Sequence, residues 1–339
     1  MENKILFRCD GGKVPEIGTG HLFRAIAIAQ ILKKKLKLKK NQINFITKNK
    51  GKYKLSLKIL KKNNLIYKIY NDKLLKENSL NEINILKKNS SKILIIDRWG
   101  HTKKNTILRL RKYFSKIILF DDMCKHKEFD LKINSLIKQN KKEYNFKTFK
   151  KLILPSYNYK KFFFKDKKQK KIVNNIFVSF GGFDKNLYSK RIIELFKNLN
   201  LNLNLFIPAS LANNKIKRIR FKKLNIIYFN NKDFYKYLNL SDISVVSGGL
   251  TLFDSLLFKI PSICLPQYNH QFLNAKIVNK LKANLIINPN NIDKSFIYNF
   301  NNLYNNYKLR KKLSKNGTKI INLKNMENIL NRIFKLYEK

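Results

Sequence analysis

One short segment near the N-terminus places a histidine and an arginine where they can do chemistry. IGTGHLFRA spans residues 17–25 and contains His21, one of only four histidines in the chain. His21 opens a predicted helix, whose positive dipole end disfavours an imidazolium, so we expect a neutral ring. A neutral imidazole can act as a general base toward water or a hydroxyl group. The alternative is that His21 only caps the helix.

The residues around His21 favour an anion but not a dinucleotide. Gly18 and Gly20 permit a tight turn and close approach of a ligand, and the first free N–H groups of the helix favour an anion. Arg24 lies one turn on and can meet a phosphate, or pair with Asp10 or another carboxylate. The third glycine of a dinucleotide fingerprint is missing, and no acid follows the next strand, which ends FITKNKG. No P-loop is present either, so we expect no nicotinamide or flavin cofactor.

Several acids and the single tryptophan follow buried-type strands. Asp10 in FRCD and Asp97 in ILIIDRWG are candidates for holding sugar hydroxyl or amide groups, or else for capping the next turn. Trp99 can stack on a sugar ring or seal the domain. Asp121 and Asp122 are adjacent, and consecutive strand-end side chains point apart. We therefore expect them to organise a loop and predict no metal site.

Two further glycine turns lie in the second half of the chain. FGGFD at 180–184 and SGGLTLFDSL at 247–256 each stand between a predicted strand and a predicted helix. Backbone N–H groups at such a helix start can cradle a diphosphate, and Asp254, one turn later, can accept from both ribose hydroxyls. The alternative is that the glycines only allow close packing. The candidate residues are Gly181, Gly182, Ser247, Gly248, Gly249, Leu250, Thr251 and Asp254.

Apolar runs alternate with helix-length amphipathic segments, which predicts parallel sheets covered by helices on both faces. We expect two Rossmann-like α/β domains at 1–158 and 172–339, joined by a basic linker at 159–171 and facing each other across a cleft. The stretch from 50 to 90 gives no clear pattern. The predicted strands are 4–9, 42–47, 92–97, 116–122, 130–136, 174–180, 203–209, 225–229, 242–249 and 261–267; the predicted helices are 21–36, 187–199, 251–259 and 271–282.

The composition argues against a nucleic-acid-binding protein. The formal net charge is +52, but only ten of the 73 basic residues are arginine, and lysine is spread over nearly every segment. This pattern is typical of an A/T-biased genome, whereas nucleic-acid binding needs focused charge with arginine. We expect no specific nucleic-acid partner. The KKFFFKDKKQKK stretch at 160–171 suits a solvated linker or, alternatively, weak adsorption to anionic lipid.

The cysteines and the N-terminal residues favour a reducing compartment. The three cysteines are odd in number and contain no CxxC pair, which argues against a disulfide framework or a structural zinc site. MENKILFRCD lacks a signal-peptide apolar stretch, and no run approaches the length needed to cross a bilayer. We expect a soluble cytoplasmic protein.

The motifs together resemble a known group of enzymes. SGGLTLFDSLLFKIPSICLPQ resembles the nucleotide-sugar half of the GT-B glycosyltransferase superfamily, especially the peptidoglycan N-acetylglucosaminyltransferase that forms lipid II. FRCD, IGTGHLFRAIAIAQ, ILIIDRWG, LFDD and FVSFGGFDKNL look like a narrower family, the UDP-2,4-diacetamido-2,4,6-trideoxy-β-L-altropyranose hydrolases of pseudaminic acid biosynthesis. The resemblance covers most of the chain apart from 50–90 and the tail.

The resemblance implies a GT-B fold and a metal-independent, inverting hydrolysis. Water is the acceptor, and a UDP-activated amino sugar is the substrate. His21 matches the catalytic base, and Asp254 matches the ribose-binding acid, which is usually Glu. Gln271 matches the glutamine of an Asn-Gln pair near the sugar, but His270 precedes it here. The other matches to the sugar site are Gly20, Arg24, Asp97 and Trp99.

Three other functions are open at this point. In a glycosyltransferase of the same architecture, His21 would deprotonate an acceptor hydroxyl instead of water. A UDP-sugar 2-epimerase would need carboxylate acid/base pairs around the sugar, and none can be assigned. A basic protein that only binds polyanions would not need His21 at all. The fold hosts several activities, so the hydrolase prediction depends on the site segments.

Overall fold

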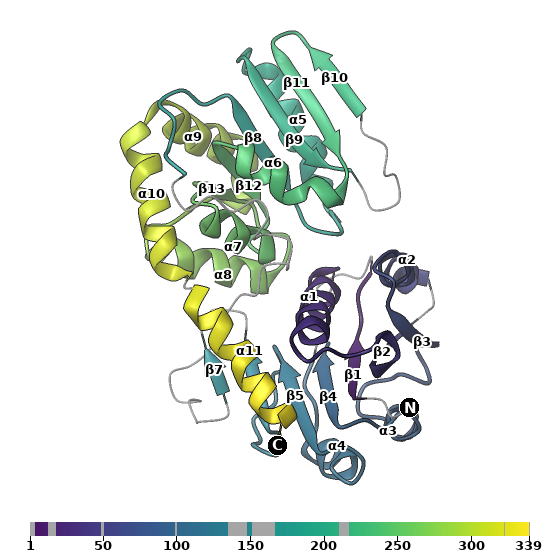
Figure 1. Ribbon diagram of the computed structural model, residues 1–339. Helices are drawn as coiled ribbons and strands as arrows, with labels where there is room; N and C mark the ends of the chain where they lie inside the picture. Colours follow the sequence, from purple (N-terminus) through teal and green to yellow (C-terminus); the bar gives the residue numbers. More distant parts are fainter. Residues whose placement is uncertain are drawn as a thin grey trace. The chain divides into compact units, whose positions relative to one another are not determined.

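The computed structural model describes residues 4–12, 18–48, 51–98, 100–134, 148–150, 167–209, 217–321 and 323–338. The chain divides into two compact units (Figure 1). Unit 1 comprises Met1–Tyr157 and Leu323–Lys339, and unit 2 comprises Asn158–Asn322.

Unit 1 is built on a seven-stranded sheet in the order β3-β2-β1-β4-β5-β6-β7, in which every pair is parallel. The central strands are buried on both faces, which is why they read as continuous apolar runs. The strands are β1 (Ile5–Cys9), β2 (Ile43–Lys48), β3 (Ile66–Tyr70), β4 (Ile93–Asp97), β5 (Lys116–Phe120), β6 (Leu131–Asn134) and β7 (Thr148–Lys150).

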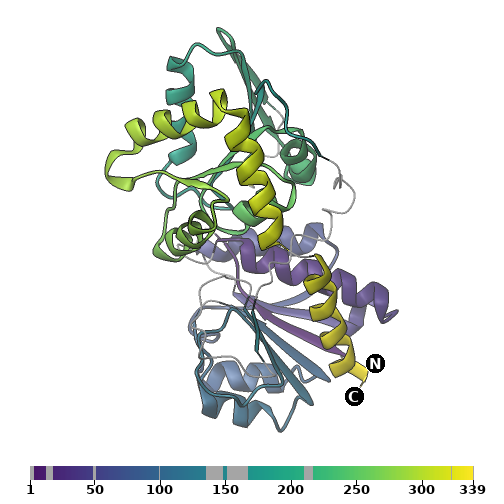
Figure 2. The ribbon, with the colours of Figure 1, turned by 90° about the vertical axis from the view of Figure 1, so that its left-hand side faces the viewer.

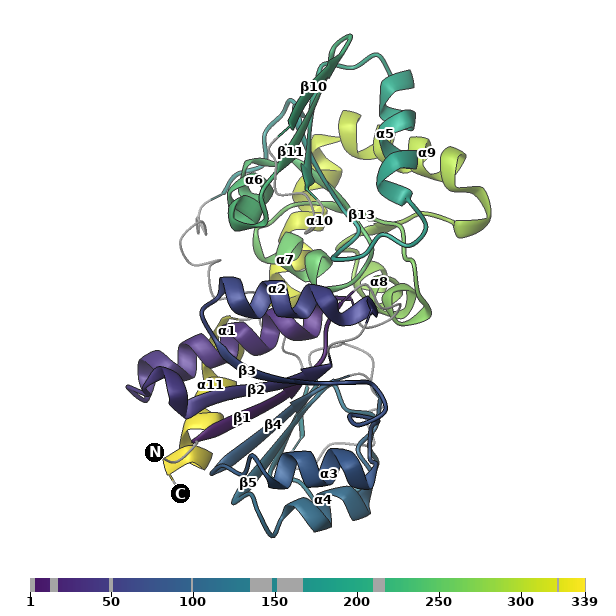
Figure 3. The same cartoon turned by 90° about the vertical axis from the view of Figure 1, so that its right-hand side faces the viewer.

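Helices cover both faces of this sheet, as the alternating pattern predicts. α1 (Gly20–Lys35) and α2 (Lys54–Lys62) lie on one face, and α3 (Leu80–Lys87) and α4 (Lys104–Leu110) lie on the other (Figure 3). The stretch that gave no clear pattern, 50–90, contains α2, β3 and α3.

The C-terminal helix α11 (Leu323–Glu338) belongs to unit 1, so the prediction of one domain over 172–339 is wrong for this segment. The helix lies alongside the N-terminal unit (yellow, Figure 2), with Ile329 and Ile333 fully buried. The Lys35 ammonium lies 4.3 Å from the Phe334 ring centroid. The apolar stripe of α11 therefore completes the core of unit 1, although it comes last in the chain.

Unit 2 contains a second seven-stranded sheet, in the order β10-β11-β9-β8-β12-β13-β14. All of its pairs are parallel except β10–β11, which forms an antiparallel hairpin at the edge. The strands are β8 (Asn175–Ser179), β9 (Leu203–Pro208), β10 (Lys217–Phe221), β11 (Leu224–Phe229), β12 (Ile243–Val246), β13 (Ser262–Cys264) and β14 (Leu285–Ile286).

Apolar and aromatic side chains fix the helices of unit 2. Phe196 of α5 packs edge-on against Phe296 and Phe300 of α9, while Phe234 of α6 meets Phe177 of β8. The helices are α5 (Tyr188–Asn198), α6 (Phe234–Leu240), α7 (Leu250–Leu257), α8 (Asn269–Lys280), α9 (Ile292–Asn305) and α10 (Tyr307–Ile320). Short 3₁₀ helices occur at Lys40–Gln42, Gly51–Tyr53, Asn231–Asp233 and Pro289–Asn291.

All ten predicted strands and all four predicted helices form, with ends that differ by a few residues. The fold class predicted from the alternating pattern is confirmed. Missed elements, among them β10, α9 and α10, lie in lysine- and asparagine-rich segments where polar residues interrupt the apolar period.

The described end of the predicted linker is part of unit 2. The Lys167 ammonium donates to the carbonyls of Asn239 and Ser241 at 2.6 and 2.7 Å. Burial lowers the pKa of Lys167 to about 8. The Arg310 guanidinium binds the carbonyls of residues 170 and 171. The proposed lipid contact of the FFF residues, 162–164, lies outside the described residues.

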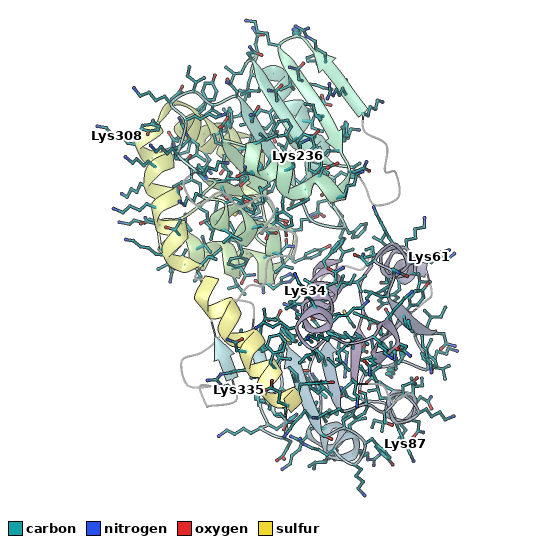
Figure 4. The ribbon with its side chains drawn as sticks, in the orientation of Figure 1. Lys34, Lys61, Lys87, Lys236, Lys308 and Lys335 are labelled. Atoms are coloured by element: carbon teal, nitrogen blue, oxygen red, sulfur yellow. The ribbon has the colours of Figure 1, made fainter. Side chains whose placement is uncertain are left out.

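Among the described residues, exposed lysines occur on many elements of both units. The labelled lysines in Figure 4 are all exposed and come from six different helices: Lys34, Lys61, Lys87, Lys236, Lys308 and Lys335. This distribution agrees with a solvated lysine-rich surface. In the portion of the chain that the structure describes, no helix has the length and apolar character needed to cross a membrane.

The turn between β12 and α7 contains two glycines with different constraints. Gly248 has φ +83°, and a Cβ there would lie 2.7 Å from the backbone oxygen of Gln271. Gly249 has φ −87°, and a Cβ there would meet nothing closer than 3.7 Å. Close packing of α8 therefore accounts for Gly248 but not for Gly249.

We predict that Gly248→Ala destabilises unit 2 by about 2–4 kcal/mol, because it combines a left-handed backbone with a backbone clash. Gly249→Ala is the matched control and is expected to change stability by less than about 0.5 kcal/mol. Urea denaturation followed by circular dichroism measures both. Equal stability of the two variants would contradict the packing described here.

Candidate functional site

In each unit successive strands are added first toward one edge of the sheet and then toward the other, and ligands bind at the carboxyl ends of the strands where this order reverses. In unit 1 this point lies between β1 and β4, where Cys9 pairs with Asp97. In unit 2 it lies between β8 and β12, which end at Ser179 and Val246. Both glycine turns predicted to bind a ligand in unit 2 follow these two strands.

The alternation of side chains along β4 decides which residues meet α1. Leu94 and Ile96 pack into the core cluster on the α3 and α4 face. Asp97, one residue later, therefore points to the opposite face, where α1 lies. The same rule sends Arg98 back to the α3 face, where its guanidinium contacts Glu82.

Four side chains, His21, Arg24, Asp97 and Asp121, form a connected cluster that we call the base cluster. His21 Nδ1 lies 2.7 Å from Asp97 Oδ1, and Arg24 Nε donates to Asp97 Oδ2 at 2.8 Å. Arg24 also binds the Asp121 carboxylate. Asp97 is fully buried, and the His21 side chain is 11% exposed. The structure thus joins three predicted site residues and adds Asp121.

The base cluster fixes the tautomer of His21. Burial alone would raise the pKa of Asp97, but Arg24 and the hydrogen bond from His21 hold it below its usual range. An ionised carboxylate only accepts hydrogen bonds, so the 2.7 Å contact with Asp97 favours a proton on His21 Nδ1; this is the shorter of the two contacts at Nδ1, because Arg24 NH2, which can only donate, lies 3.1 Å away. The lone pair is then on Nε2, which has no hydrogen-bond partner among the described residues. This is the arrangement of a histidine base oriented by a carboxylate.

Asp121 and Asp122 have separate roles, and the loop prediction holds for only one of them. Asp122 accepts from the amides of Thr102 and Cys124 at 3.0 and 2.8 Å, so it organises the loop as predicted. Asp121 has φ +48° and directs its carboxylate to Arg24 instead. Adjacent strand-end residues do point apart, and one of the two points into the site.

Asp10 belongs to a second buried ion network and does not pair with Arg24. Its Oδ1 lies 2.7 Å from Arg8 NH1 and accepts from the Lys48 amide at 3.1 Å. Arg8 Nε also donates to Glu82 at 2.9 Å. Burial alone would raise the pKa of Asp10, but Arg8 and Lys48 hold it below its usual range. The binding of a sugar by Asp10 stays a prediction.

The sequence interpretation missed Arg8, Glu82 and Arg98, all of which are buried. One signal was available: Arg8 stands inside an apolar strand, and a charge there needs a buried partner. Arg98 Nε and NH1 are buried without a hydrogen-bond partner in the described structure. Trp99, the predicted stacking residue, lies outside the described residues.

The glycine turn before α1 has the predicted tight geometry. Gly18 has φ +53°, and its carbonyl accepts from the Gly12 amide at 2.7 Å. Gly20 is the first residue of α1, and the N-cap residue, Thr19, makes no side-chain capping hydrogen bond. Thr19 therefore leaves the first amides of α1 to other acceptors.

The two glycine turns of unit 2 differ in what occupies their helix N-termini. Gly181 has φ +80°, but the first amides of α5 already bind the Asp184 carboxylate, at 3.0 and 2.7 Å. At α7 the N-cap residue is Gly249, which has no side chain of its own to cap the helix. The amides of Leu250 and Thr251 therefore offer the better anion site. Ser247 lies buried directly before this turn, and Gly182 lies in the first turn.

Asp254, the predicted ribose-binding acid, is buried on α7. The Tyr235 hydroxyl donates to its Oδ1 at 3.4 Å. Burial raises the pKa of Asp254 to about 7, and the Tyr235 hydrogen bond only partly offsets this. Such a carboxyl group is a poorly satisfied acceptor that ligand hydroxyls can complete.

Gln271 and His270 open α8, and their side chains diverge. Gln271 is buried, and its Oε1 accepts from the Gln267 amide at 2.9 Å. Gln267 in turn donates to the carbonyl of Phe180, so these amides link the start of α8 to the first glycine turn of unit 2. The His270 ring stacks on the Tyr268 ring, with 5.7 Å between the ring centroids. Contact of either residue with a sugar stays a prediction.

Both carboxylates of the base cluster are already paired with one guanidinium. Arg24 bridges Asp97 and Asp121, the carboxylates that by themselves would suggest a cation site. Among the described residues, no group of three His, Cys, Asp or Glu side chains is arranged to hold a metal ion.

No protein-family model matches the chain. It is 26% identical over 267 residues to the UDP-2,4-diacetamido-2,4,6-trideoxy-beta-L-altropyranose hydrolase of Campylobacter jejuni, covering 76% of this chain and 89% of that protein. It is also 26% identical over 287 residues to the uncharacterized protein MJ1062 of Methanocaldococcus jannaschii, covering 78% of this chain but only 56% of that protein. The chain thus spans little more than half the length of this second relative.

A solved structure shows the same architecture. The calicheamicin glycosyltransferase CalG4 superimposes with a TM-score of 0.64 at 10% identity, covering 99% of this chain and 98% of that one. With two parallel-sheet α/β units, the chain has the GT-B fold of glycosyltransferases and is related in sequence to a sugar-nucleotide hydrolase.

Proposed function

We propose that this protein hydrolyses a UDP-activated diacetamido-trideoxyhexose, as in the biosynthesis of pseudaminic-type nonulosonic acids. The observation that carries the proposal is the base cluster, in which Asp97 fixes the tautomer of His21 at the carboxyl edge of the unit 1 sheet. The sequence relation to the C. jejuni hydrolase supports the substrate class.

In this proposal His21 Nε2 removes a proton from water, and the resulting nucleophile attacks the anomeric carbon of the sugar. The C–O bond to the diphosphate breaks with inversion, giving the free sugar and UDP. Asp97 stabilises the imidazolium that forms, because it is ionised and already hydrogen-bonded to Nδ1. The proton then leaves the imidazolium for solvent.

Unit 2 binds the UDP part in the same proposal. The uncapped N-terminus of α7 meets the diphosphate through the amides of Leu250 and Thr251, and so stabilises the charge that develops on the leaving group. Asp254 accepts from the ribose hydroxyls. A Cβ would fit at Gly249, so packing within the protein does not require a glycine there. Close approach of a ligand to the backbone would explain the glycine.

A GT-B glycosyltransferase is the alternative, favoured by the fold shared with CalG4. The base cluster suits either reaction, since a histidine that deprotonates water can also deprotonate an acceptor hydroxyl. The nature of the acceptor therefore separates the two functions.

We expect the purified protein to release UDP from UDP-diacetamido sugars without any acceptor, with ¹⁸O from labelled water in the sugar. His21→Ala should lower kcat about 10²- to 10⁴-fold. The matched control is His101→Ala, which removes an exposed histidine of the same unit. Label in UDP would mean attack at phosphorus, and UDP release only with an added acceptor would establish a glycosyltransferase.

The pKa of Asp254 predicts a dependence of stability on pH. The carboxyl group titrates near 7 when folded and near 3.8 when unfolded, so the folded state binds the extra proton between these values. The contribution of Asp254 to the free energy of unfolding is therefore most favourable below about pH 4, and it is lost as the pH rises through 7. Asp254→Asn should be more stable than wild type at pH 8, by at most about 4 kcal/mol, and should lose most of this advantage at pH 5.

The same residue predicts how UDP binding depends on pH. An ionised Asp254 accepts ribose hydroxyls more strongly than a protonated one. Between pH 6 and pH 8, UDP affinity should rise about fivefold more for wild type than for Asp254→Asn. Isothermal titration calorimetry measures the UDP affinity of both proteins at each pH. The ionisation of UDP affects both equally, so it cancels in the comparison. Parallel pH profiles would exclude Asp254 from the nucleotide site.

A further inference from the structure

We propose that Asp121 is a positioning residue for the hydrolysis: it holds Arg24, and through Arg24 it holds the Asp97–His21 pair in its working geometry and charge state. This inference rests on the proposed function. Asp121 itself does not touch His21 and was expected only to organise a loop.

The contacts form a chain of mostly buried groups that leads from Asp121 through Arg24 and Asp97 to His21. Arg24 uses Nε and NH2 on the two oxygens of Asp97, and its remaining nitrogen, NH1, binds Asp121. The guanidinium also lies 5.4 Å from the centroid of the Phe120 ring. Because a guanidinium is planar and rigid, fixing NH1 also fixes the nitrogens that hold Asp97.

The backbone at Asp121 is adapted to this role. β5 ends at Phe120, and Asp121 follows with φ +48°, a conformation that costs free energy for most residues. The Asp121 amide donates to the carbonyl of Ile133 at 2.8 Å, which anchors the turn to β6. As a result, Asp121 meets Arg24 on α1 while Asp122 meets the amide of Thr102.

The charge of Asp121 also matters for the base. His21 contacts Asp97 and Arg24; Asp121 acts on this pair through Arg24, and Cys9 of β1 lies beside Asp97 in the sheet. Burial and the nearby carboxylates raise the pKa of Cys9 well above its usual value, so the thiol stays neutral. Two carboxylates thus face one guanidinium. The remaining negative charge stabilises the imidazolium that forms when His21 takes a proton.

Asp121→Asn tests this inference without new backbone strain, because asparagine tolerates positive φ. We expect kcat to fall about 10- to 100-fold while KM changes less than about twofold. We also expect the acid limb of the pH–rate profile to move to lower pH, because one negative charge has been removed. Asp122→Asn is the matched control: it should lower stability but leave kcat per folded molecule and the pH profile unchanged.

A second measurement does not depend on activity. Nitrogen-15 NMR of the imidazoles at high pH, with the His21 signals assigned by comparison with His21→Ala, reports which nitrogen carries the proton. Wild type should show the Nδ1–H tautomer at His21. Asp121→Asn should show a mixture of the two tautomers, since Asp97 is no longer held in place.

The outcomes separate the two proposals. If wild type hydrolyses no UDP-sugar, the proposed function fails, while a tautomer change in Asp121→Asn still supports the positioning role. If Asp121→Asn keeps both the kcat and the tautomer of wild type, Asp121 has no positioning role. An equal loss of kcat in Asp122→Asn would likewise overturn the inference, because it would assign the effect to the loop.

Discussion

The N-terminal site depends on one buried arginine. Arg24 neutralises part of the charge on Asp97 and Asp121, and without it two buried carboxylates would stand close together with no cation between them. With it, Asp97 stays ionised and accepts a hydrogen bond from His21 Nδ1–H, which leaves the lone pair of Nε2 for chemistry. Removing Arg24 would therefore remove the positive charge between the carboxylates, the position of Asp97 and the preference for one tautomer of His21.

The parallel sheet explains why these side chains come from distant parts of the chain. β1, β4 and β5 are neighbours in the sheet, so their carboxyl ends bring α1, Asp97 and Asp121 together across a span of about a hundred residues. The same topology in unit 2 places two glycine turns side by side. Asp184 already binds the first amides of α5, whereas the N-cap residue of α7 is a glycine without a side chain.

Arginine and lysine occupy different places in this protein. Four of the ten arginines are buried, each bound to carboxylates or carbonyls. Among the far more numerous lysines, only Lys48 and Lys132 are buried within the part of the chain that the structure describes. Arginine forms several directed hydrogen bonds from a rigid plane, which suits interior pairing. The lysine excess instead covers the outside of the protein.

The sequence alone determined the fold class and ten of the fourteen strands in the described residues, and it singled out His21, Arg24 and Asp97 as candidate site residues. These follow from local patterns, since buried parallel strands are continuous apolar runs and site residues follow strand ends. Only the tertiary structure decided that Asp121 joins the base cluster, that Asp10 joins another network, and that α11 completes unit 1. Those outcomes depend on strand order and on the directions of side chains across the sheet, which spacing along a chain does not encode.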